Sequence, residues 1–310
     1  MAEATERIPL VHWGSGSLYG DGSENDHFQH FFEPISKTPI DRLIEPKLSY
    51  FPRKWNWKNL LRDEVNQYEG VDSRMAALFF YSRDEDVAVS DFYTSISNII
   101  PWLPPDHPDF ESSTEPVCRR LVRKYIRPKK RYLERAEAFI RDTIGCEDFL
   151  SIHIRGTDKV GEVPNLNAVN AQYFEAVDQM SPPQKKGAIF IMTDDCHILK
   201  TFKGRYGDRI YHTDCMRSEG DIGLHYQVEK SAGSQLGEQI LLDSCIALQG
   251  SGFVGNGFSR PSVMIYLLKD WGKNAVLLDQ KTYESHHVKL HAWTTGGSRL
   301  STPLHLWSPS

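Results

Sequence analysis

The chain has 310 residues, of which 40% are hydrophobic and 25% are charged, and its formal net charge is −5. This balance is typical of a globular protein and gives no overall attraction to nucleic acid or to an anionic membrane. No apolar run is long enough to span a bilayer. Because the length exceeds that of a usual single core, two domains of roughly 150 residues are expected.

The cysteines and the start of the chain carry no strong signal. The five cysteines, at positions 118, 146, 196, 215 and 245, include no Cys-x-x-Cys pair. Neither a structural zinc site nor a disulfide framework is therefore expected. The opening MAEATERIP lacks the features of a signal peptide, so a complete chain of this sequence is expected in the cytoplasm.

The first 110 residues have weak periodicity and are rich in Trp, Tyr and Pro. Two short apolar segments, LVHW (10–13) and MAALFFY (75–81), are predicted to be buried strands. Between them, GSGSLYGDG (14–22) has a glycine spacing similar to that of phosphate-binding loops, but no helical pattern follows it. We therefore expect a flexible loop there. The basic run RRLVRKYIRPKKR (119–131) is interpreted as a solvated helix face, with a phosphate-binding surface as the alternative.

From residue 127 onwards, strands and helices are predicted to alternate. The predicted strands are FLSIHI (149–154), KKGAIFIMTDD (185–195), RIYHTD (209–214), GFVGN (252–256) and NAVLLD (274–279); the predicted helices cover 127–145, 167–180, 198–207, 234–248 and 262–271. Continuous apolar strands separated by helices indicate a doubly wound parallel sheet that is buried on both faces. Ligands of such sheets bind beyond the carboxyl ends of the strands, so the polar residues there are expected to converge.

The first of these strands ends in two candidate site residues, His153 and Arg155, which share one face by the period of two. His153 is either a satisfied core residue or part of a pocket. The planar guanidinium of Arg155 suits an anionic group such as a phosphate. A structural ion pair with Asp158 is the alternative.

Asp243 lies in an apolar helical stripe with Leu236, Ile240 and Ala247. A buried carboxylate is costly unless donors meet it. Those donors are either a neighbouring backbone group or arginine, or the two adjacent N–H groups on the edge of a guanine. The residues alone leave both possibilities open.

Two further positions follow strands. In FSRPS (258–262), Ser259 lies near the start of a predicted helix, whose free N–H groups suit a phosphate, although a simple N-cap explains it equally well. Asp194 and Asp195 fit either a divalent metal or the cap of the helix that begins at His197, and we favour the cap.

The second half contains the segments IHIRGTDKVGE, IFIMTDDCHILK and ILLDSCIALQGSGFVGNGFSR, in that order. Together with FFEPISKTP (31–39) and RKYIRPKKRYLE upstream, they resemble the α1,6-fucosyltransferases. This family includes the enzyme that core-fucosylates N-glycans and the rhizobial nodulation fucosyltransferase. The HxRxxDKVG pattern is the more specific part of the likeness, whereas TDD alone is not specific.

The resemblance implies an α/β, GT-B-like fold with two Rossmann-like domains. The first, residues 1–126, is expected to be an irregular acceptor-side domain that is reduced or truncated. The second, residues 127–310, is expected to bind GDP-fucose on its doubly wound parallel sheet. The implied reaction is an inverting transfer of fucose from GDP-fucose to a hydroxyl of a glycan acceptor, the 6-OH of a GlcNAc residue, without a metal or other cofactor. A fragment of an anchored enzyme of this kind would come from the Golgi lumen.

The resemblance also implies roles for particular residues. Arg155 would grip the β-phosphate of GDP, His153 would line the guanosine pocket, and Asp243 would accept from guanine. The full set implied to bind the nucleotide sugar is His153, Arg155, Asp195, Asp243, Ser259 and Arg260.

Glu162, supported by Lys159, is implied to be the general base that deprotonates the acceptor hydroxyl. A transferase needs this carboxylate, whereas a non-catalytic sugar-nucleotide or glycan binder of the same fold does not. Such a binder and a polypeptide O-fucosyltransferase are the two alternatives to the α1,6-fucosyltransferase interpretation.

Overall fold

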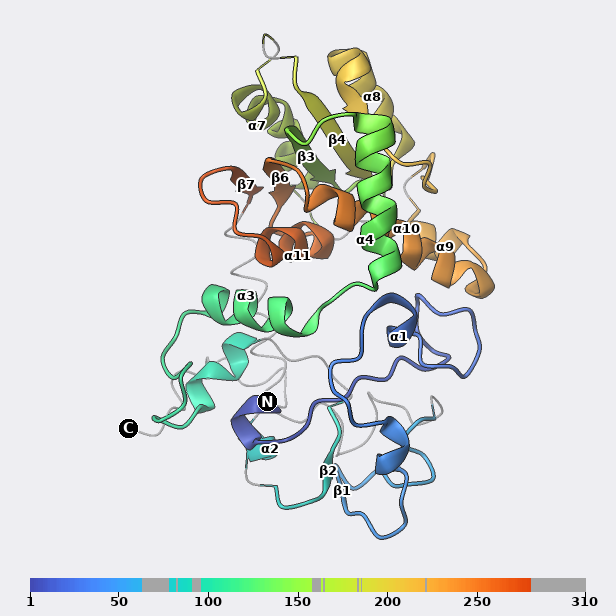
Figure 1. Ribbon diagram of the computed structural model, residues 1–310, viewed down its shortest axis with the longest axis vertical. Helices are drawn as coiled ribbons and strands as arrows, with labels where there is room; N and C mark the ends of the chain where they lie inside the picture. The colour runs from blue at the N-terminus through green and yellow to red at the C-terminus, as the bar shows by residue number, and fades with distance from the viewer. Residues whose placement is uncertain are drawn as a thin grey trace.

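The computed structural model describes residues 1–62, 78–81, 83–90, 96–157, 163, 165–182, 184, 186–220 and 222–279. The chain forms two halves, which lie one above the other in Figure 1, with helix α3 (Thr114–Tyr125) lying where they meet. The upper half contains the large sheet, and the lower half contains short elements joined by loops.

The N-terminal half is irregular, as expected. Its elements before α3 are η1 (Glu3–Thr5), α1 (Phe28–Phe31), η2 (Ile40–Leu43), β1 (Tyr50–Phe51), α2 (Leu78–Tyr81), β2 (Val87–Ala88), η3 (Ile96–Asn98) and η4 (Ile100–Trp102). Strands β1 and β2 pair in parallel, and Tyr50, Trp55 and Val87 form a small buried cluster beside them.

The strand predicted at LVHW (10–13) is wrong. The backbone of Trp13 makes local bonds instead: its N–H donates to Asp26 Oδ1 at 3.1 Å, and its carbonyl accepts from His27 N at 2.9 Å. Its ring packs edge-on against Phe28, with centroids 5.3 Å apart. Trp13 is thus partly covered by an aromatic cluster rather than by strand pairing.

The strand predicted at residues 75–81 is also wrong where it can be compared. Residues 75–77 lie outside the described residues, and Leu78–Tyr81 is the single helical turn α2. Phe80 of this turn packs edge-on against Phe51 of β1.

The C-terminal half confirms the predicted parallel sheet. Within the described residues its five strands lie in the order β5-β4-β3-β6-β7, and every pairing is parallel. The strands are β3 (Phe149–Ile154), β4 (Ala188–Thr193), β5 (Ile210–Tyr211), β6 (Gly252–Asn256) and β7 (Ala275–Leu278). From β3 the following strands, β4 and β5, are added on one side of the sheet, whereas β7 is added next to β6 on the other side. The strand order therefore changes direction between the neighbours β3 and β6.

The helices of this half follow the predicted alternation. They are α4 (Lys130–Phe139), the π-helical turn η5 (Ile140–Ile144), α6 (Leu166–Ala171), α7 (Tyr173–Met180), α8 (Cys196–Tyr206), η7 (Gly207–Arg209), α9 (Leu224–Gln227), η8 (Lys230–Ala232), α10 (Gly233–Ala247) and α11 (Arg260–Leu268). The helix predicted at 127–145 therefore ends in a π-helical turn, and Gly145 terminates it with a φ of 73°.

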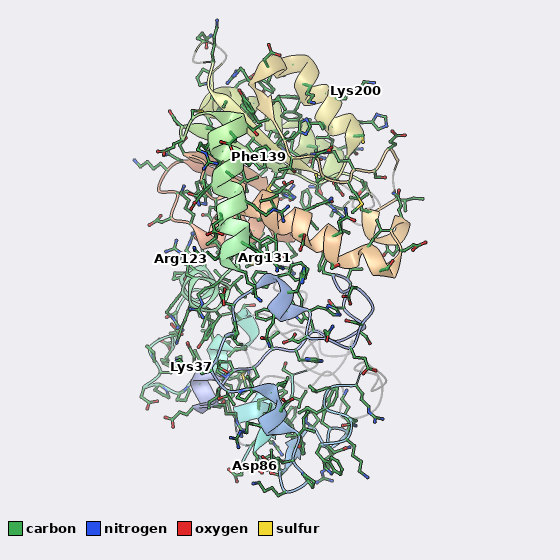
Figure 2. All side chains as sticks on the ribbon, turned by 45° about the vertical axis from the view of Figure 1, so that its right-hand side comes forward. Lys37, Asp86, Arg123, Arg131, Phe139 and Lys200 are labelled. Atoms are coloured by element: carbon green, nitrogen blue, oxygen red, sulfur yellow. The ribbon has the colours of Figure 1, made fainter. Side chains whose placement is uncertain are left out.

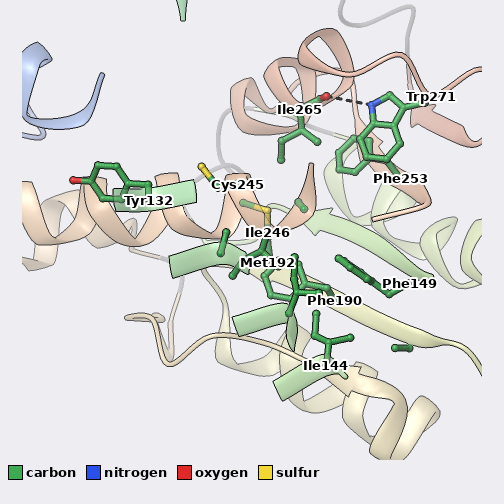
Figure 3. Close-up of a cluster of buried hydrophobic side chains, with 14 of the residues drawn as sticks. Tyr132, Ile144, Phe149, Phe190, Met192, Cys245, Ile246, Phe253, Ile265 and Trp271 are labelled. Atoms are coloured by element: carbon green, nitrogen blue, oxygen red, sulfur yellow. Dashed lines mark hydrogen bonds between the residues drawn. The ribbon is translucent and has the colours of Figure 1, made fainter. Parts of the chain in front are cut away.

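Both faces of the sheet are covered, which is why its strands are continuous apolar runs. On one face, residues of α4, α10 and α11 pack around Phe149, Phe190 and Phe253, as Figure 3 shows. On the other face, residues of α7 and α8 pack against Ile152 and Ile191. The alternation along β3 places His153 on the face of α11.

Most basic side chains of the run at residues 119–131 are exposed, as expected of a solvated helix face, but several of them also bind carbonyls of distant segments. Arg119 of α3 donates to the carbonyls of Tyr266 and Lys269 at the end of α11, at 2.8 and 2.9 Å. Arg131 donates to the carbonyl of His30 at 2.7 Å. Figure 2 places Arg123 and Arg131 at the level where the two halves meet. These arginines join segments that are far apart in the sequence.

Candidate functional site

Arg155 lies at the carboxyl end of the central strand β3, where its guanidinium meets Asp194. Arg155 Nη1 is 2.6 Å from Asp194 Oδ2, and the two side chains are 22% and 11% exposed. Asp194 directly follows β4, the neighbouring strand. The ion-pair alternative for Arg155 is thus realised with Asp194, while Asp158 lies outside the described residues. The pair holds a partly exposed cation at this edge of the sheet.

The loop after Arg155 wraps around the same carboxylate. Gly156 N donates to Asp194 Oδ1 at 3.0 Å, and Thr157 Oγ1 donates to Asp194 Oδ2 at 2.7 Å. Thr157 has a φ of 52°, a strained conformation for a β-branched residue. A Cβ on Gly156 would come within 2.5 Å of Asp195 Oδ2, so only glycine fits at this position. This loop leads directly into the segment that contains Lys159 and Glu162.

Asp195 caps helix α8, as favoured from the sequence. Its Oδ1 accepts from His197 N at 2.7 Å and from Ile198 N at 3.1 Å. Both acids after β4 are therefore engaged by protein donors. Within the described part of the chain, no group of three or more His, Cys, Asp or Glu residues is arranged to hold a metal ion. The assignment of Asp195 to a nucleotide-sugar site stays a prediction.

His153 is buried and bonded within the protein. Its Nδ1 lies 2.6 Å from Ser262 Oγ in the first turn of α11. Burial lowers the pKa of the imidazole to about 4, because desolvation outweighs the nearby negative charge of Asp194. His153 is thus neutral at physiological pH. Its Nδ1 thus has a hydrogen-bond partner in the core, and its role in a guanosine pocket stays a prediction.

Ser259 and Arg260 lie at the start of α11, beside the end of β3. Ser259 occupies the N-cap position and is 2% exposed, but its side chain makes no capping hydrogen bond. The simple N-cap explanation therefore fails for its hydroxyl. Arg260 is exposed, and Pro261 follows it in the first turn. The first turn of α11 thus directs its N–H groups to the same edge of the sheet as Arg155.

Asp243 is buried in α10, as its place in the apolar stripe predicts, and it is 4% exposed. Its Oδ1 accepts from Thr213 Oγ1 at 2.5 Å, just beyond the end of β5. Burial raises the pKa of this carboxyl to about 6, although the Thr213 hydroxyl and the Arg217 charge oppose the rise. The hydroxyl of Thr213, which the sequence did not indicate, is thus one donor to Asp243, and the contact of Asp243 with guanine stays a prediction.

Arg217 completes the surroundings of Asp243. Its Nη2 donates to the Thr213 carbonyl at 3.0 Å and its Nη1 to the Cys215 carbonyl at 3.1 Å. Its Nε is buried and makes no hydrogen bond in the described part of the chain. One residue further on, Ser218 N donates to the Asp194 carbonyl at 2.8 Å. The segment after β5 therefore links the Asp243 position to the Arg155 position.

Tyr19 brings the N-terminal half to this edge. Burial raises the pKa of its hydroxyl, and the positive charge of Arg155 opposes that rise, so the two groups lie near each other. The glycine-rich loop that carries Tyr19 packs on α10, where a Cβ on Gly233 would come within 2.5 Å of Leu18 O. The loop is thus held against the sheet domain by close backbone contact.

Sequence reasoning missed several residues at this edge: Tyr19, Tyr173, Thr213, Arg217, Asn256 and Ser262. Thr213 and Asn256 could have been found, because each is a polar residue at or next to the carboxyl end of a predicted strand (209–214 and 252–256). Nothing in the local pattern indicated the others, whose partners are distant in the chain. Glu162 and Lys159, the predicted base and its support, lie outside the described residues.

Strand order and site together define the class of fold. A doubly wound parallel sheet with polar residues gathered where its order reverses is the arrangement of nucleotide-binding α/β domains. The cavity of about 230 Å³ among η1, η4 and α3 is lined mainly by apolar side chains and includes none of the predicted site residues. None of the described helices is both long enough and apolar enough to cross a membrane.

Solved structures of one glycosyltransferase share this fold. The chain is similar to the fucosyltransferase NodZ from Bradyrhizobium, with a TM-score of 0.51 and 15% identity over 86% of this chain and 83% of that one. It is likewise similar to NodZ α1,6-fucosyltransferase co-crystallised with GDP, with a TM-score of 0.55 and 17% identity over 86% and 84% of the two chains. The expected GT-B-like α/β fold is confirmed.

Other comparisons add little. A structure of POFUT1 in complex with GDP overlaps 55% of this chain with a TM-score of 0.35, which is too low to indicate a common architecture. No protein-family model and no curated protein sequence matches the chain. The boundary expected between residues 126 and 127 stays a prediction.

Proposed function

We propose that this chain is a fucosyltransferase that moves fucose from GDP-fucose to a hydroxyl of a glycan acceptor, the 6-OH of a GlcNAc residue. The fold supports this proposal, because the NodZ structures that share it include one soaked with GDP-fucose. The observation that carries the proposal is the position of Arg155. It lies where the strand order of the sheet reverses, beside the N-terminus of α11, so that a diphosphate there would meet a cation and the positive end of a helix.

The chemistry needs two functions at this site. The acceptor oxygen attacks C1 of fucose, and the C1–O bond to the diphosphate breaks, leaving its electron pair on the β-phosphate. Arg155 and the first turn of α11 would stabilise the negative charge that grows there. Glu162 would take the proton of the attacking hydroxyl, and Lys159 would keep Glu162 ionised. No metal is needed in this scheme.

Asp243 would select the base. A guanine presents two adjacent N–H donors to one carboxylate, whereas an adenine edge does not. The buried position of Asp243 supports this role, because the discrimination against a base without those donors is largest where water is excluded.

The test is transfer itself. The chain is incubated with GDP-fucose and oligomers of GlcNAc, the products are detected by mass spectrometry, and the linkage and its configuration are determined by NMR. GDP-mannose is the donor control. We expect a fucosylated product with inverted configuration at C1. Binding of GDP-fucose without turnover for any acceptor would favour the non-catalytic binder, and failure to bind GDP would reject the proposal.

Two variants separate the proposed roles. Arg155→Ala should weaken GDP binding and slow turnover, with a loss of roughly 3 kcal/mol in transition-state stabilisation. Glu162→Gln should keep GDP affinity but slow transfer by about 10²–10⁴-fold. If Glu162→Gln transfers fucose at the parent rate, another carboxylate is the base, and Asp158 is the first to test.

A further inference from the structure

Asn256, the last residue of β6, is fully buried and uses both ends of its side-chain amide. Its Nδ2 donates to Tyr173 Oη at 3.0 Å, and its Oδ1 accepts from Ser259 N at 2.9 Å. Tyr173 Oη in turn donates to the His153 carbonyl at 2.6 Å. One chain of hydrogen bonds therefore runs from the N-cap residue of α11 to the end of β3.

The donor and acceptor roles along this row of hydrogen bonds are determined by the backbone groups at its two ends. A carbonyl only accepts, so the Tyr173 hydroxyl must give its proton to His153. The oxygen of Tyr173 is then left to accept, and the NH₂ group of Asn256 must face it. The backbone N–H of Ser259 only donates, so it requires the amide oxygen. A flipped amide would place donor against donor and acceptor against acceptor, and only one orientation satisfies every group.

The end of β3 is tied to α11 on both faces of the sheet. Tyr173 reaches it from α7 on one face, while on the other face His153 Nδ1 meets Ser262 Oγ at 2.6 Å. Tyr173, Asn256 and Ser262 each have 0% exposure. Hydrogen bonds in such a dry environment are strong, and an interruption is costly because no water replaces the lost partner. The separation between the end of β3 and the start of α11 is thus closely constrained.

We propose that Asn256 is a positioning residue for the diphosphate. Through Tyr173 it holds the N-terminus of α11 at a set distance from Arg155, which follows His153 by two residues, so that the two can bind one diphosphate together. The inference rests on the proposed function, because the diphosphate is that of GDP-fucose. The role needs no contact between Asn256 and the ligand; it acts by preorganising the groups that make contact.

Two variants interrupt the chain of bonds with little change in volume. Asn256→Asp keeps an oxygen for Ser259 N but replaces the donor to Tyr173 with an acceptor. Tyr173→Phe removes only the hydroxyl oxygen. In either variant we expect the affinity for GDP, measured by titration calorimetry, to fall about tenfold. The affinity for GMP, which lacks the β-phosphate, should change by less than about twofold, since the base and ribose contacts are unaffected.

Ser151→Ala is the matched control. Ser151 lies on β3, the strand of His153, and is fully buried. It donates to the Ala247 carbonyl at 2.9 Å, away from the carboxyl edge of the sheet. Its loss should lower the melting temperature but leave the preference for GDP over GMP unchanged. The double variant Asn256→Asp/Tyr173→Phe should lose no more GDP preference than either single variant, because both changes interrupt the same chain.

The outcomes are distinct. Equal losses of GDP and GMP affinity, or an unchanged GDP preference in folded Tyr173→Phe, would show that the chain of bonds serves stability alone and would overturn the inference. If Asn256→Asp does not fold, Tyr173→Phe decides the question by itself. If the unaltered chain binds GDP no better than GMP, the proposed diphosphate site fails, and this inference fails with it.

Discussion

Asp243 and His153 show how burial alone can set the ionisation of a residue. Burial raises the pKa of the Asp243 carboxyl to about 6 and lowers the pKa of the His153 imidazole to about 4. Both shifts disfavour the charged form, because desolvation outweighs the opposite charges nearby, Arg217 for Asp243 and Asp194 for His153. The two groups therefore act on stability in opposite directions over the same range of pH.

We expect Asp243→Asn to be more stable than the parent chain at pH 7.5. The folded-state pKa of Asp243 is raised, so the folded protein binds the proton more tightly, and stability falls as pH rises from about 4 to 6. Replacing the ionised group should raise the free energy of unfolding by on the order of 2–3 kcal/mol above pH 6, and this gain should vanish below pH 4. Chemical denaturation of both proteins across this range measures it.

The same variant should bind GDP less well, because an amide cannot accept both N–H groups of guanine with a charged oxygen pair. GDP affinity of the parent should also weaken below about pH 6, as Asp243 becomes protonated. The control is Asp178→Asn: the carboxyl of Asp178 has a lowered pKa because Arg205 and Tyr206 donate to it, so this change should not stabilise the fold. A parent-like GDP affinity in Asp243→Asn would contradict the guanine assignment.

At the scale of elements, the contact between the glycine-rich loop and α10 depends on the absence of a side chain. A Cβ on Gly233 would come within 2.5 Å of Leu18 O and 2.6 Å of Gly20 O, both of which belong to the backbone. Neither oxygen can move without moving the loop. Since Tyr19 lies between these two residues, a shift of the loop would also move Tyr19, whose hydroxyl feels the charge of Arg155.

Gly233→Ala should therefore lower stability by roughly 1–3 kcal/mol and reduce GDP affinity as well. The matched control is Gly204→Ala in α8, where the added Cβ meets nothing within 4 Å. That change should stabilise the chain by about 0.5–1 kcal/mol, because alanine favours a helix more than glycine does, and should leave GDP binding unchanged. Melting curves and calorimetry provide both measurements. Equal behaviour of the two variants would show that the loop contact has no part in the site.

For the molecule as a whole, the two halves are joined by arginines and by the loop that carries Tyr19. Arg119 of α3 donates to carbonyls at the C-terminal end of α11, and the first turn of the same helix lies beside Arg155. Helix α11 thus contacts the N-terminal half through its last turn and the candidate site through its first. The proposed donor site and the proposed acceptor side of the molecule are connected through one helix.

We expect fucose transfer by the whole chain to survive EDTA, with a rate within about twofold of the untreated protein. The cationic role is proposed for Arg155 and α11, and the acids after β4 are occupied: Asp194 by Arg155, and Asp195 by the backbone of α8. Activity before and after chelation, and after addition of Mg²⁺ or Mn²⁺, measures this. Loss on chelation with recovery on metal addition would make Asp194 and Asp195 metal ligands.

The sequence by itself determined the elements whose signals are local. Continuous apolar runs indicated the strands of the parallel sheet, and polar residues directly after them, such as Arg155, indicated its functional edge. The helical spacing around Asp243 indicated a buried carboxylate. Each of these follows from periodicity or from the geometry of a parallel sheet, neither of which requires knowledge of a distant partner.

Only the tertiary structure decided what depends on partners far along the chain. LVHW is apolar enough for a strand, yet Trp13 packs on α1 because no neighbouring strand is available to it in the described part of the chain. The basic run has a charge pattern that fits solvent or phosphate, yet Arg119 meets carbonyls some 150 residues away. Asn256 ends a predicted strand and Tyr173 lies in a predicted helix, but nothing in the local sequence pairs the two side chains. A hydrogen bond forms only when its donor and its acceptor come together. For residues far apart in the sequence, that depends on the fold and not on the local pattern.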